Sequence, residues 1–331
     1  MRIPLSVLDL APVPTGTTPS EAIRRTVDLA RLADKLGYVR HWFAEHHGMP
    51  SVASSAPEIL IGHIAAATTR IRVGSGGIML PNHTPLKVAE TFRTLEALYP
   101  GRIDLGLGRA PGSDQAASRA LEASDGHDFS QQLAELLAFC GQTAFSANHP
   151  FRKVLAIPDD APLPPIWILG SSGASARLAG NAGMGYSFAS HFSPTPAGPA
   201  FNAYADSFKP SAQFAKSNAI LGVAVVCAET DEEADDLATT MDLAWLRIRR
   251  GEFRPLPSPE EAKAYPYADF EREAVQEYRS RTVIGNPQKV KTQIESLVRD
   301  SGADEVMVVS NLHDHKKRLR SYELLAQAFS A

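Results

Sequence analysis

The sequence predicts an α/β fold, specifically a (β/α)8 TIM barrel, from three observations. Short apolar runs rich in β-branched residues alternate with longer amphipathic stretches along the whole chain, as in a parallel sheet built from βαβ units. We count eight such runs, the number that closes a barrel. A length of 331 residues fits one barrel with insertions. We therefore treat residues 1–331 as a single domain.

Each of the eight runs has the length and composition of a buried strand. Because strands in a barrel are parallel, their carboxyl ends meet at one rim, where the chemistry of such barrels takes place. The predicted strands are Ile3–Asp9, Tyr38–Ala44, Ile71–Met79, Ile103–Leu107, Ile166–Leu169, Gly185–Ala189, Ala219–Cys227 and Glu305–Val309.

The helical stretches between them carry start and stop signals. Three have proline in the first turn, where its missing N–H group costs nothing, and one begins at the N-cap pair Asn286-Pro287. Gly37 ends the first helix as a C-cap would. The helices predicted in this way are Ala22–Leu36, Ile59–Ala67, Leu86–Leu98, Ala176–Ala182, Ala234–Trp245 and Gln288–Val298.

Two stretches interrupt the alternation. Residues 141–165 are rich in proline and aspartate, and residues 251–282 are rich in proline, tyrosine and charge. Both are predicted to be insertions, after the fourth and the seventh predicted strand. We expect insertions to close the substrate pocket, with 251–282 the better lid candidate, because long loops at barrel rims are often functional.

Composition excludes several classes of protein. The chain is 44% hydrophobic and 21% charged, which is typical of a globular protein. A net charge of -4, from 33 basic and 37 acidic residues, offers no basic surface for nucleic acid or a membrane. Cys140 and Cys227 have no metal or redox spacing, and we find neither a signal peptide nor an apolar run of about 18 residues. We expect a cytoplasmic protein.

The second predicted strand is followed by Glu45-His46-His47. These residue types suit a metal ion, but adjacent strand residues point to opposite faces, so the two imidazoles should not converge on one ion. We therefore predict no metal site. A structural histidine pair is one alternative, and a catalytic imidazole that exchanges protons near neutral pH is the other.

The third predicted strand contains Gly74-Ser75-Gly76-Gly77, although glycine weakens a strand. A ligand close to the backbone, an unusual backbone geometry or a tight bend needed for packing would each explain these residues.

A phosphate site is predicted at the ends of the next two strands. Arg109 follows the fourth predicted strand among small residues, and a guanidinium matches the geometry of phosphate oxygens. The fifth predicted strand runs through Leu169-Gly170-Ser171-Ser172 into a helix that begins near Ser175, and the free N–H groups of a helix start favour an anion. Together they imply a phosphorylated cofactor or substrate.

These motifs, in this order, resemble the bacterial luciferase-like flavin-dependent monooxygenase superfamily. The resemblance extends from Ile3 to Phe329. The motifs that carry it are Glu45-His46-His47, Gly74–Pro81, Gly101–Arg109, Gly170-Ser171-Ser172 and Ile284-Gly285-Asn286-Pro287.

The resemblance implies a barrel that binds reduced FMN, or in some branches the deazaflavin F420. It assigns Arg109 and Leu169-Gly170-Ser171-Ser172 with Ser175 to the cofactor phosphate, and Ser75-Gly76-Gly77, with a cis peptide at Gly76-Gly77, to the flavin ring. It makes His46 a catalytic histidine, with Glu45 beside it. Gly108 stands where luciferase has cysteine, so light emission is not implied.

The implied reaction joins reduced FMN and O₂ in a flavin C4a-(hydro)peroxide that oxidises a small organic substrate, with His46 as base or proton shuttle. A separate NAD(P)H:flavin reductase would supply the reduced FMN, and a homodimer is expected.

Three alternatives stay open. One is an F420-dependent oxidoreductase that transfers hydride without O₂, and another is a flavin-binding protein without activity. The third is a metal hydrolase, which should contain stoichiometric zinc or iron.

Overall fold

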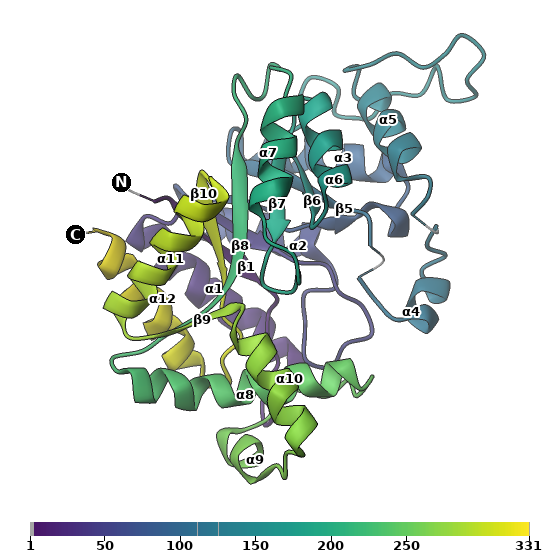
Figure 1. The fold of residues 1–331 in the computed structure, drawn as a ribbon. Coiled ribbons are helices and arrows are strands. Elements are labelled where there is room, and N and C mark those ends of the chain that lie inside the picture. The colour runs from purple at the N-terminus through teal and green to yellow at the C-terminus, as the bar shows by residue number, and fades with distance from the viewer. Residues whose placement is uncertain (1–2, 111, 125, 331) are drawn as a thin grey trace.

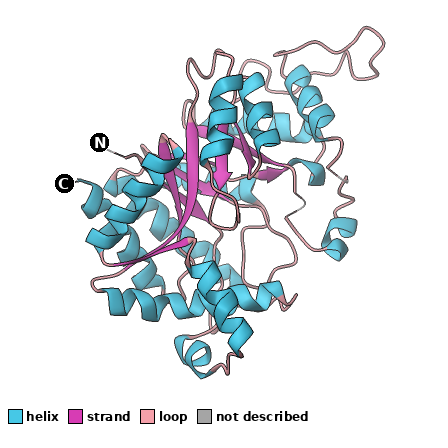
Figure 2. Cartoon of the chain, in the orientation of Figure 1, coloured by secondary structure: helices cyan, strands magenta, loops and turns pink. Residues whose placement is uncertain are grey.

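Eight parallel strands close into a barrel in the computed structural model, which describes residues 3–110, 112–124 and 126–330 (Figures 1 and 2). β10 closes the barrel because it pairs with β1 on one side and β8 on the other. The TIM-barrel prediction is confirmed. The barrel strands are β1 (Leu5–Asp9), β2 (Arg40–Phe43), β3 (Arg72–Ser75), β5 (Ile103–Gly108), β6 (Ile166–Gly170), β7 (Gly185–Ala189), β8 (Ala219–Cys227) and β10 (Glu305–Val309).

Helices surround the barrel, and several begin and end at the residues that the sequence marks. The Thr18 hydroxyl accepts the N–H of Glu21, and Gly37 ends the same helix with φ 83°. Asn286 caps α11 in the same way as Thr18 caps α1. The helices are α1 (Pro19–Leu36), α2 (Pro57–Ala67), α3 (Pro85–Leu98), α4 (Gln115–Ala120), α5 (Phe129–Phe139), α6 (Gly173–Asn181), α7 (Gly198–Ser207), α8 (Asp231–Arg249), α9 (Pro259–Ala264), α10 (Asp269–Arg279), α11 (Pro287–Ser301), α12 (His315–Ser330) and the 3-10 turn η1 (Leu80–Asn82).

The alternation of strand side chains separates two apolar cores. Outward residues such as Val7 and Phe43 pack against the helices. Inward residues such as Leu8, Trp42 and Trp167 fill the barrel. The barrel is therefore a packed core, and a ligand has to bind at one of its ends.

A buried polar layer crosses the barrel near the amino ends of the strands. Arg40 donates to Asp104 at 2.8 Å and to Glu305 at 3.0 Å, and its guanidinium lies 4.6 Å from the ring of Trp167. Arg72 also donates to Asp104, at 2.6 Å. Burial alone would raise the pKa of Asp104, but the two guanidinium groups lower it below its ordinary value.

The predicted strand Ile71–Met79 is interrupted. It forms β3 and β4 (Ile78–Met79), which are separated by a cis peptide between Gly76 and Gly77. A Cβ atom on Gly76 would lie 2.6 Å from Leu8 Cδ1, and one on Gly77 would lie 2.7 Å from the carbonyl oxygen of Gly106. Close packing therefore requires both glycines.

The two predicted insertions lie at opposite ends of the barrel. Residues 141–165 connect α5 with the amino end of β6, at the upper right of Figure 1, whereas α9 and α10 lie at the bottom. The first insertion therefore cannot close a site at the carboxyl rim. The second contains α9 and α10 and leads into β9 (Thr282–Gly285), a strand that the sequence analysis did not predict and that pairs with the last residues of β8.

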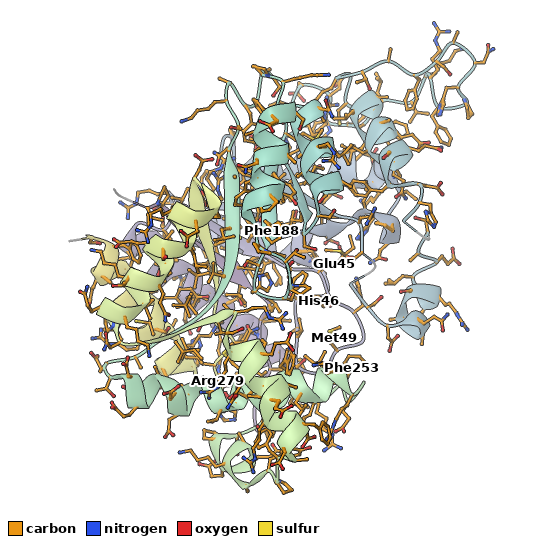
Figure 3. The ribbon with its side chains drawn as sticks, in the orientation of Figure 1. Glu45, His46, Met49, Phe188, Phe253 and Arg279 are labelled. Carbon is orange, nitrogen blue, oxygen red and sulfur yellow. The ribbon has the colours of Figure 1, made fainter. Side chains whose placement is uncertain are left out.

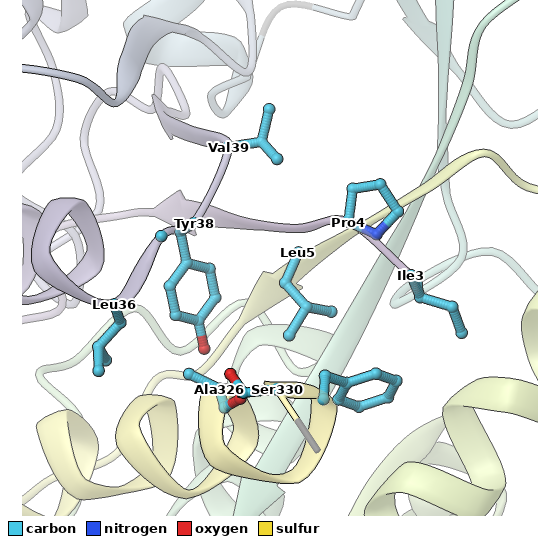
Figure 4. Close-up of a pocket in the computed structure, with 10 residues that line it drawn as sticks. Ile3, Pro4, Leu5, Leu36, Tyr38, Val39, Ala326 and Ser330 are labelled. Carbon is cyan, nitrogen blue, oxygen red and sulfur yellow. Dashed lines mark hydrogen bonds between the residues drawn. The ribbon is translucent and has the colours of Figure 1, made fainter. Parts of the chain in front are cut away.

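A hollow of about 250 Å³ lies at the amino end of the barrel, where Tyr38 and Leu5 face Ala326 of α12 (Figure 4). It is on the far side of the barrel from the carboxyl rim. Among the described residues, no helix is both long and apolar enough to cross a membrane.

Candidate active site

The strand registers order the predicted site residues along the carboxyl rim. Phe43 of β2 pairs with Ser75, Met79 of β4 pairs with Gly108, and Gly170 of β6 pairs with Phe188. The β5–β6 register, extended by two residues beyond Leu107 and Ile168, brings Arg109 beside Gly170. In Figure 3, Glu45 and His46 lie between Phe188 and the part of the chain that carries Phe253 and Arg279.

Glu45 is fully buried and is surrounded by donors. Its oxygens accept from His47 Nε2 at 2.9 Å and from His83 Nε2 at 3.0 Å. They also accept from the Asn82 side chain and the Met79 N–H, both at 2.9 Å. Burial raises the pKa of this carboxyl, but the hydrogen bonds and charge of His83, with the bonds from Asn82 and His47, lower it overall. Glu45 is therefore an ionised anchor that joins the end of β2 to β4 and η1.

His46 turns away from His47. Its Nδ1 lies 3.1 Å from the carbonyl oxygen of Gly112, which can only accept, so Nδ1 carries the proton and Nε2 carries the lone pair. Burial lowers the pKa of His46, against the opposing effects of the Gly112 carbonyl and Glu45. This imidazole is neutral at pH 7 and can accept a proton at Nε2.

Arg109 is exposed, and within residues 3–110, 112–124 and 126–330 its side chain has no hydrogen-bond or ion-pair partner. On the neighbouring strand end, Ser172 caps α6 and its hydroxyl accepts the N–H of Ser175. The N–H groups of Gly173 and Ala174 have no partner within the helix. Two sources of positive potential therefore lie on adjacent strands.

Close packing fixes the start of α6. Ser175 Oγ donates to the carbonyl of Ser172 at 2.9 Å, and Tyr186 donates to the same carbonyl at 3.1 Å. A Cβ atom on Gly170 would lie 2.2 Å from Ser175 Oγ. The Ser175 hydroxyl is thus engaged within the segment, while Ser171 is half-buried and Ser172 is exposed.

Two other predicted residues contribute mainly through packing. Ser75 is buried and exchanges hydrogen bonds with Gly106, donating to its carbonyl at 2.8 Å and accepting its N–H at 2.9 Å. Leu169 points inward, since its Cδ1 lies 2.9 Å from the position of a Cβ on Gly106. Of these two residues, Leu169 is the one whose side chain faces the inside of the barrel.

Ion pairs hold the insertion 251–282 against α8. Arg247 pairs with Glu261 at 2.6 Å, and Arg279 pairs with Asp242 at 2.7 Å. Where this segment leaves α8, the N–H of Leu256 donates to the carbonyl of Val13 at 2.9 Å, next to the end of β1. Residues 251–282 are therefore packed against α8 and the chain that follows β1, where they form one side of the rim.

The sequence analysis missed three residues at this end of the barrel. His83 follows η1, His191 follows β7, and Arg177 folds back over the start of α6, with its guanidinium 3.5 Å from the position of a Cβ on Gly173. His191 directly follows a predicted strand, so the rule that identified His46 could have found it. His83 and Arg177 lie beyond strand ends and carry no such signal.

Known proteins resemble this chain along nearly its whole length. Residues 3–305 match the protein family described as "Luciferase-like monooxygenase". A luciferase-like monooxygenase of Escherichia coli is 44% identical over 97% of this chain and 96% of its own. The N-acetyl-S-alkylcysteine monooxygenase of Bacillus subtilis is 32% identical over 99% of each chain. The crystal structure of apo-MsnO8 has a TM-score of 0.90 at 42% identity and covers 99% of this chain and 98% of its own.

Two more distant structures share the fold. One is the oxygenating constituent of 3,6-diketocamphane monooxygenase from Pseudomonas putida in complex with FMN, with a TM-score of 0.73 at 19% identity, covering 99% of this chain and 98% of its own. The other is an F420-dependent secondary alcohol dehydrogenase, with a TM-score of 0.72 at 15% identity over 99% of each chain. From the family match and the close relatives, the chain belongs to the luciferase-like monooxygenase family.

Proposed function

We propose that the protein is a flavin-dependent monooxygenase that uses reduced FMN and O₂ to oxidise a small organic substrate. The observation that carries the proposal is that Arg109 and the start of α6 occupy adjacent strand ends on the same rim as the neutral imidazole of His46. Such a rim can bind a phosphate at one point and move a proton at another.

The residues fit the phosphate of FMN. This phosphate is a terminal monoester that carries close to two negative charges, whereas F420 carries a phosphodiester with one. An exposed guanidinium and the free N–H groups of α6 suit the more highly charged group, and the Arg177 guanidinium nearby adds to the same potential. When bound, reduced FMN supplies the electrons that activate O₂.

His46 is the proton-handling residue in this proposal. Its Nδ1–H bond to Gly112 fixes the ring and the tautomer, and Nε2 accepts a proton from the reacting molecules or returns it. Glu45 is a positioning residue: its bonds to His47 and His83 tie the segment that contains His46 to the end of η1.

Binding titrations with free FMN and free F420 test the choice of cofactor. We expect FMN to bind and F420 to bind at least about tenfold more weakly, because one charge-assisted hydrogen bond contributes ~1.5 kcal/mol or more. Arg109→Met should weaken FMN binding and leave riboflavin binding unchanged. Tight F420 binding with negligible FMN binding would show hydride transfer on the same barrel instead.

Turnover tests the role of His46. With a flavin reductase, NADH and N-acetyl-S-methylcysteine, a thioether of the class named for the Bacillus relative, we expect His46→Ala to lower kcat by ~10² or more. His63→Ala, which removes an exposed imidazole on α2, is the matched control. Other small thioethers and ketones extend the test to substrate class. If the protein binds FMN but His46→Ala turns over every substrate as fast as wild type, the catalytic assignment is wrong.

The proposal also includes partners. A separate reductase would deliver reduced FMN. A second copy of the chain could cover the exposed apolar side chains of Ile59 on α2 and Leu98 on α3.

A further inference from the structure

His191 lies inside the mouth of the barrel. It follows β7 by two residues, and its N–H donates to the carbonyl of Gly222 in β8 at 3.0 Å. Ile220 and Ala224, on either side of Gly222, belong to the inner core, so Gly222 faces inward. A Cβ atom on Gly222 would lie 3.1 Å from Nδ1 and 3.4 Å from Cε1 of His191. The imidazole therefore occupies the space that a side chain at position 222 would fill.

The ring has a buried polar atom without a partner. Within the described part of the chain, His191 Nδ1 makes no hydrogen bond of acceptable geometry and is shielded from solvent. A buried nitrogen of this kind costs ~1–3 kcal/mol, which a phenylalanine or leucine at the same position would avoid. Packing alone therefore does not explain a histidine here.

Two neighbours define the state of the ring. Burial lowers the pKa of His191 to about 4, although the Gly222 carbonyl favours a proton, and a charge on His46 lowers it further. His191 is thus neutral at pH 7. Nδ1 is the ring nitrogen that lies over Gly222, and the Gly222 carbonyl favours a proton on the ring. We therefore assign the proton to Nδ1 and the lone pair to Nε2, as in His46.

We propose that His191 is a second imidazole of the active site, whose Nε2 accepts a hydrogen bond from a neutral N–H or O–H group of the bound molecule on the β7–β8 side. The proposal rests on the proposed function because it takes this rim as the binding site. Two molecules can supply such a group: the ring of the reduced flavin, or the substrate. Two imidazoles of the same tautomer then approach the bound molecules, one from β2 and one from β7.

Two variants separate hydrogen bonding from packing. His191→Phe keeps a planar ring without nitrogen, and His191→Gln keeps an acceptor of similar reach. His63→Phe, on the outer face of α2, is the matched control. Circular dichroism and the thermal midpoint identify any variant that fails to fold. If His191→Phe does not fold, His191→Gln is compared with wild type.

The measurements are the Kd for oxidised and for photoreduced FMN and the KM and kcat with N-acetyl-S-methylcysteine. We expect His191→Phe to weaken one of these bindings by about three- to tenfold, with recovery to within about threefold in His191→Gln and no change in His63→Phe. A loss confined to reduced FMN identifies the flavin as donor, and a rise confined to KM identifies the substrate. Unchanged values in His191→Phe, or a glutamine variant no better than phenylalanine, overturn the proposal.

A third readout does not depend on flavin chemistry. Imidazole ¹⁵N spectra of the ligand-free protein should show His191 as the neutral Nδ1–H tautomer from pH 5.5 to 8. An Nε2–H tautomer, or titration in that range, overturns the proposal even if FMN binds. If wild type binds neither FMN nor F420, the proposed function fails instead, whatever the spectra show.

Discussion

At the scale of single residues, Glu45 shows how a buried carboxylate can stabilise the site. It is 0% exposed and accepts from three side chains and one backbone N–H. We expect Glu45→Gln to lower the free energy of unfolding by ~2 kcal/mol or more, because the amide cannot accept all of these bonds and removes the charge opposite His83. Chemical denaturation measures this change, with Glu232→Gln on the exposed start of α8 as control. Equal stability of the two variants would contradict the anchoring role.

The interaction between Glu45 and His83 should make stability depend on pH. The folded-state pKa of Glu45 is lowered, so its contribution to the free energy of unfolding is present above its ordinary pKa of 4.5 and is lost as the pH falls through the folded-state pKa. Burial opposes protonation of His83, but Glu45 raises the pKa of His83 overall. The contribution of His83 to the free energy of unfolding is therefore present below its ordinary pKa of 6.5, and it is lost as the pH rises through the folded-state pKa. The difference in the free energy of unfolding between wild type and Glu45→Gln should therefore be largest between pH 4.5 and 6.5, and it should become smaller at lower and at higher pH.

The position of a side chain could be predicted where it depends on a strand end. His46 and Arg109 lie at the carboxyl rim, as expected from the strands that precede them, and their roles stay predictions. The sequence could not show that Glu45 is saturated with donors, because His83 and Asn82 reach it from another part of the rim. Nor could it show that the hydroxyl of Ser75 bonds to Gly106 instead of facing a ligand.

At the scale of elements, α10 is attached to α8 by a partly buried cluster. Arg279 donates to Asp242 and Asp235, and burial raises the pKa of Asp242 although Arg279 opposes the change. We expect Arg279→Met to leave Asp242 without a cation and to loosen α10. Amide exchange in residues 251–282 should rise by about tenfold or more, the equivalent of ~1.4 kcal/mol of local opening, with little change in the barrel strands.

The control for this experiment is Arg254→Met, an exposed residue whose nearest acidic partner, Glu252, lies 3.6 Å away. Rapid exchange in wild-type residues 251–282 would instead indicate that this lid candidate is mobile.

Two features of the fold were not predicted: the strand β9 and the interruption between β3 and β4. β9 has four residues, and the predicted insertion ends at the first of them, Thr282. The apolar pair Val283-Ile284 is too short to be recognised as a strand from the sequence. The interruption of Ile71–Met79 depends on contacts with Leu8 and Gly106, which are distant in sequence. Local pattern cannot report such contacts.

At the scale of the whole molecule, the polar layer around Arg40 lies at the end of the barrel opposite to the site. We expect Arg40→Met to lower the free energy of unfolding by ~3–5 kcal/mol, because Glu305 and Asp104 would lose a buried partner. Arg299 has a side chain that is 72% exposed, with its Nε 4.0 Å from Asp300. Arg299→Met should therefore change the free energy of unfolding by less than ~0.5 kcal/mol. Denaturant unfolding measures both, and a similar small change in the two variants would show that the layer is not stabilising.

The whole fold was the most predictable level. All eight predicted strands overlap barrel strands, because each predicted run is mostly apolar and belongs to a strand that is largely buried. The polar layer was not predicted, since Arg40 and Glu305 are separated by most of the chain and meet only when the barrel closes.

That layer also has a thermal consequence. The hydration of charged groups becomes less favourable as temperature rises, so the cost of burying Arg40, Asp104 and Glu305 decreases on heating, while the benefit of apolar burial levels off. Any gain in the free energy of unfolding from replacing all three residues with apolar ones should then be smaller near the melting temperature than at 25 °C.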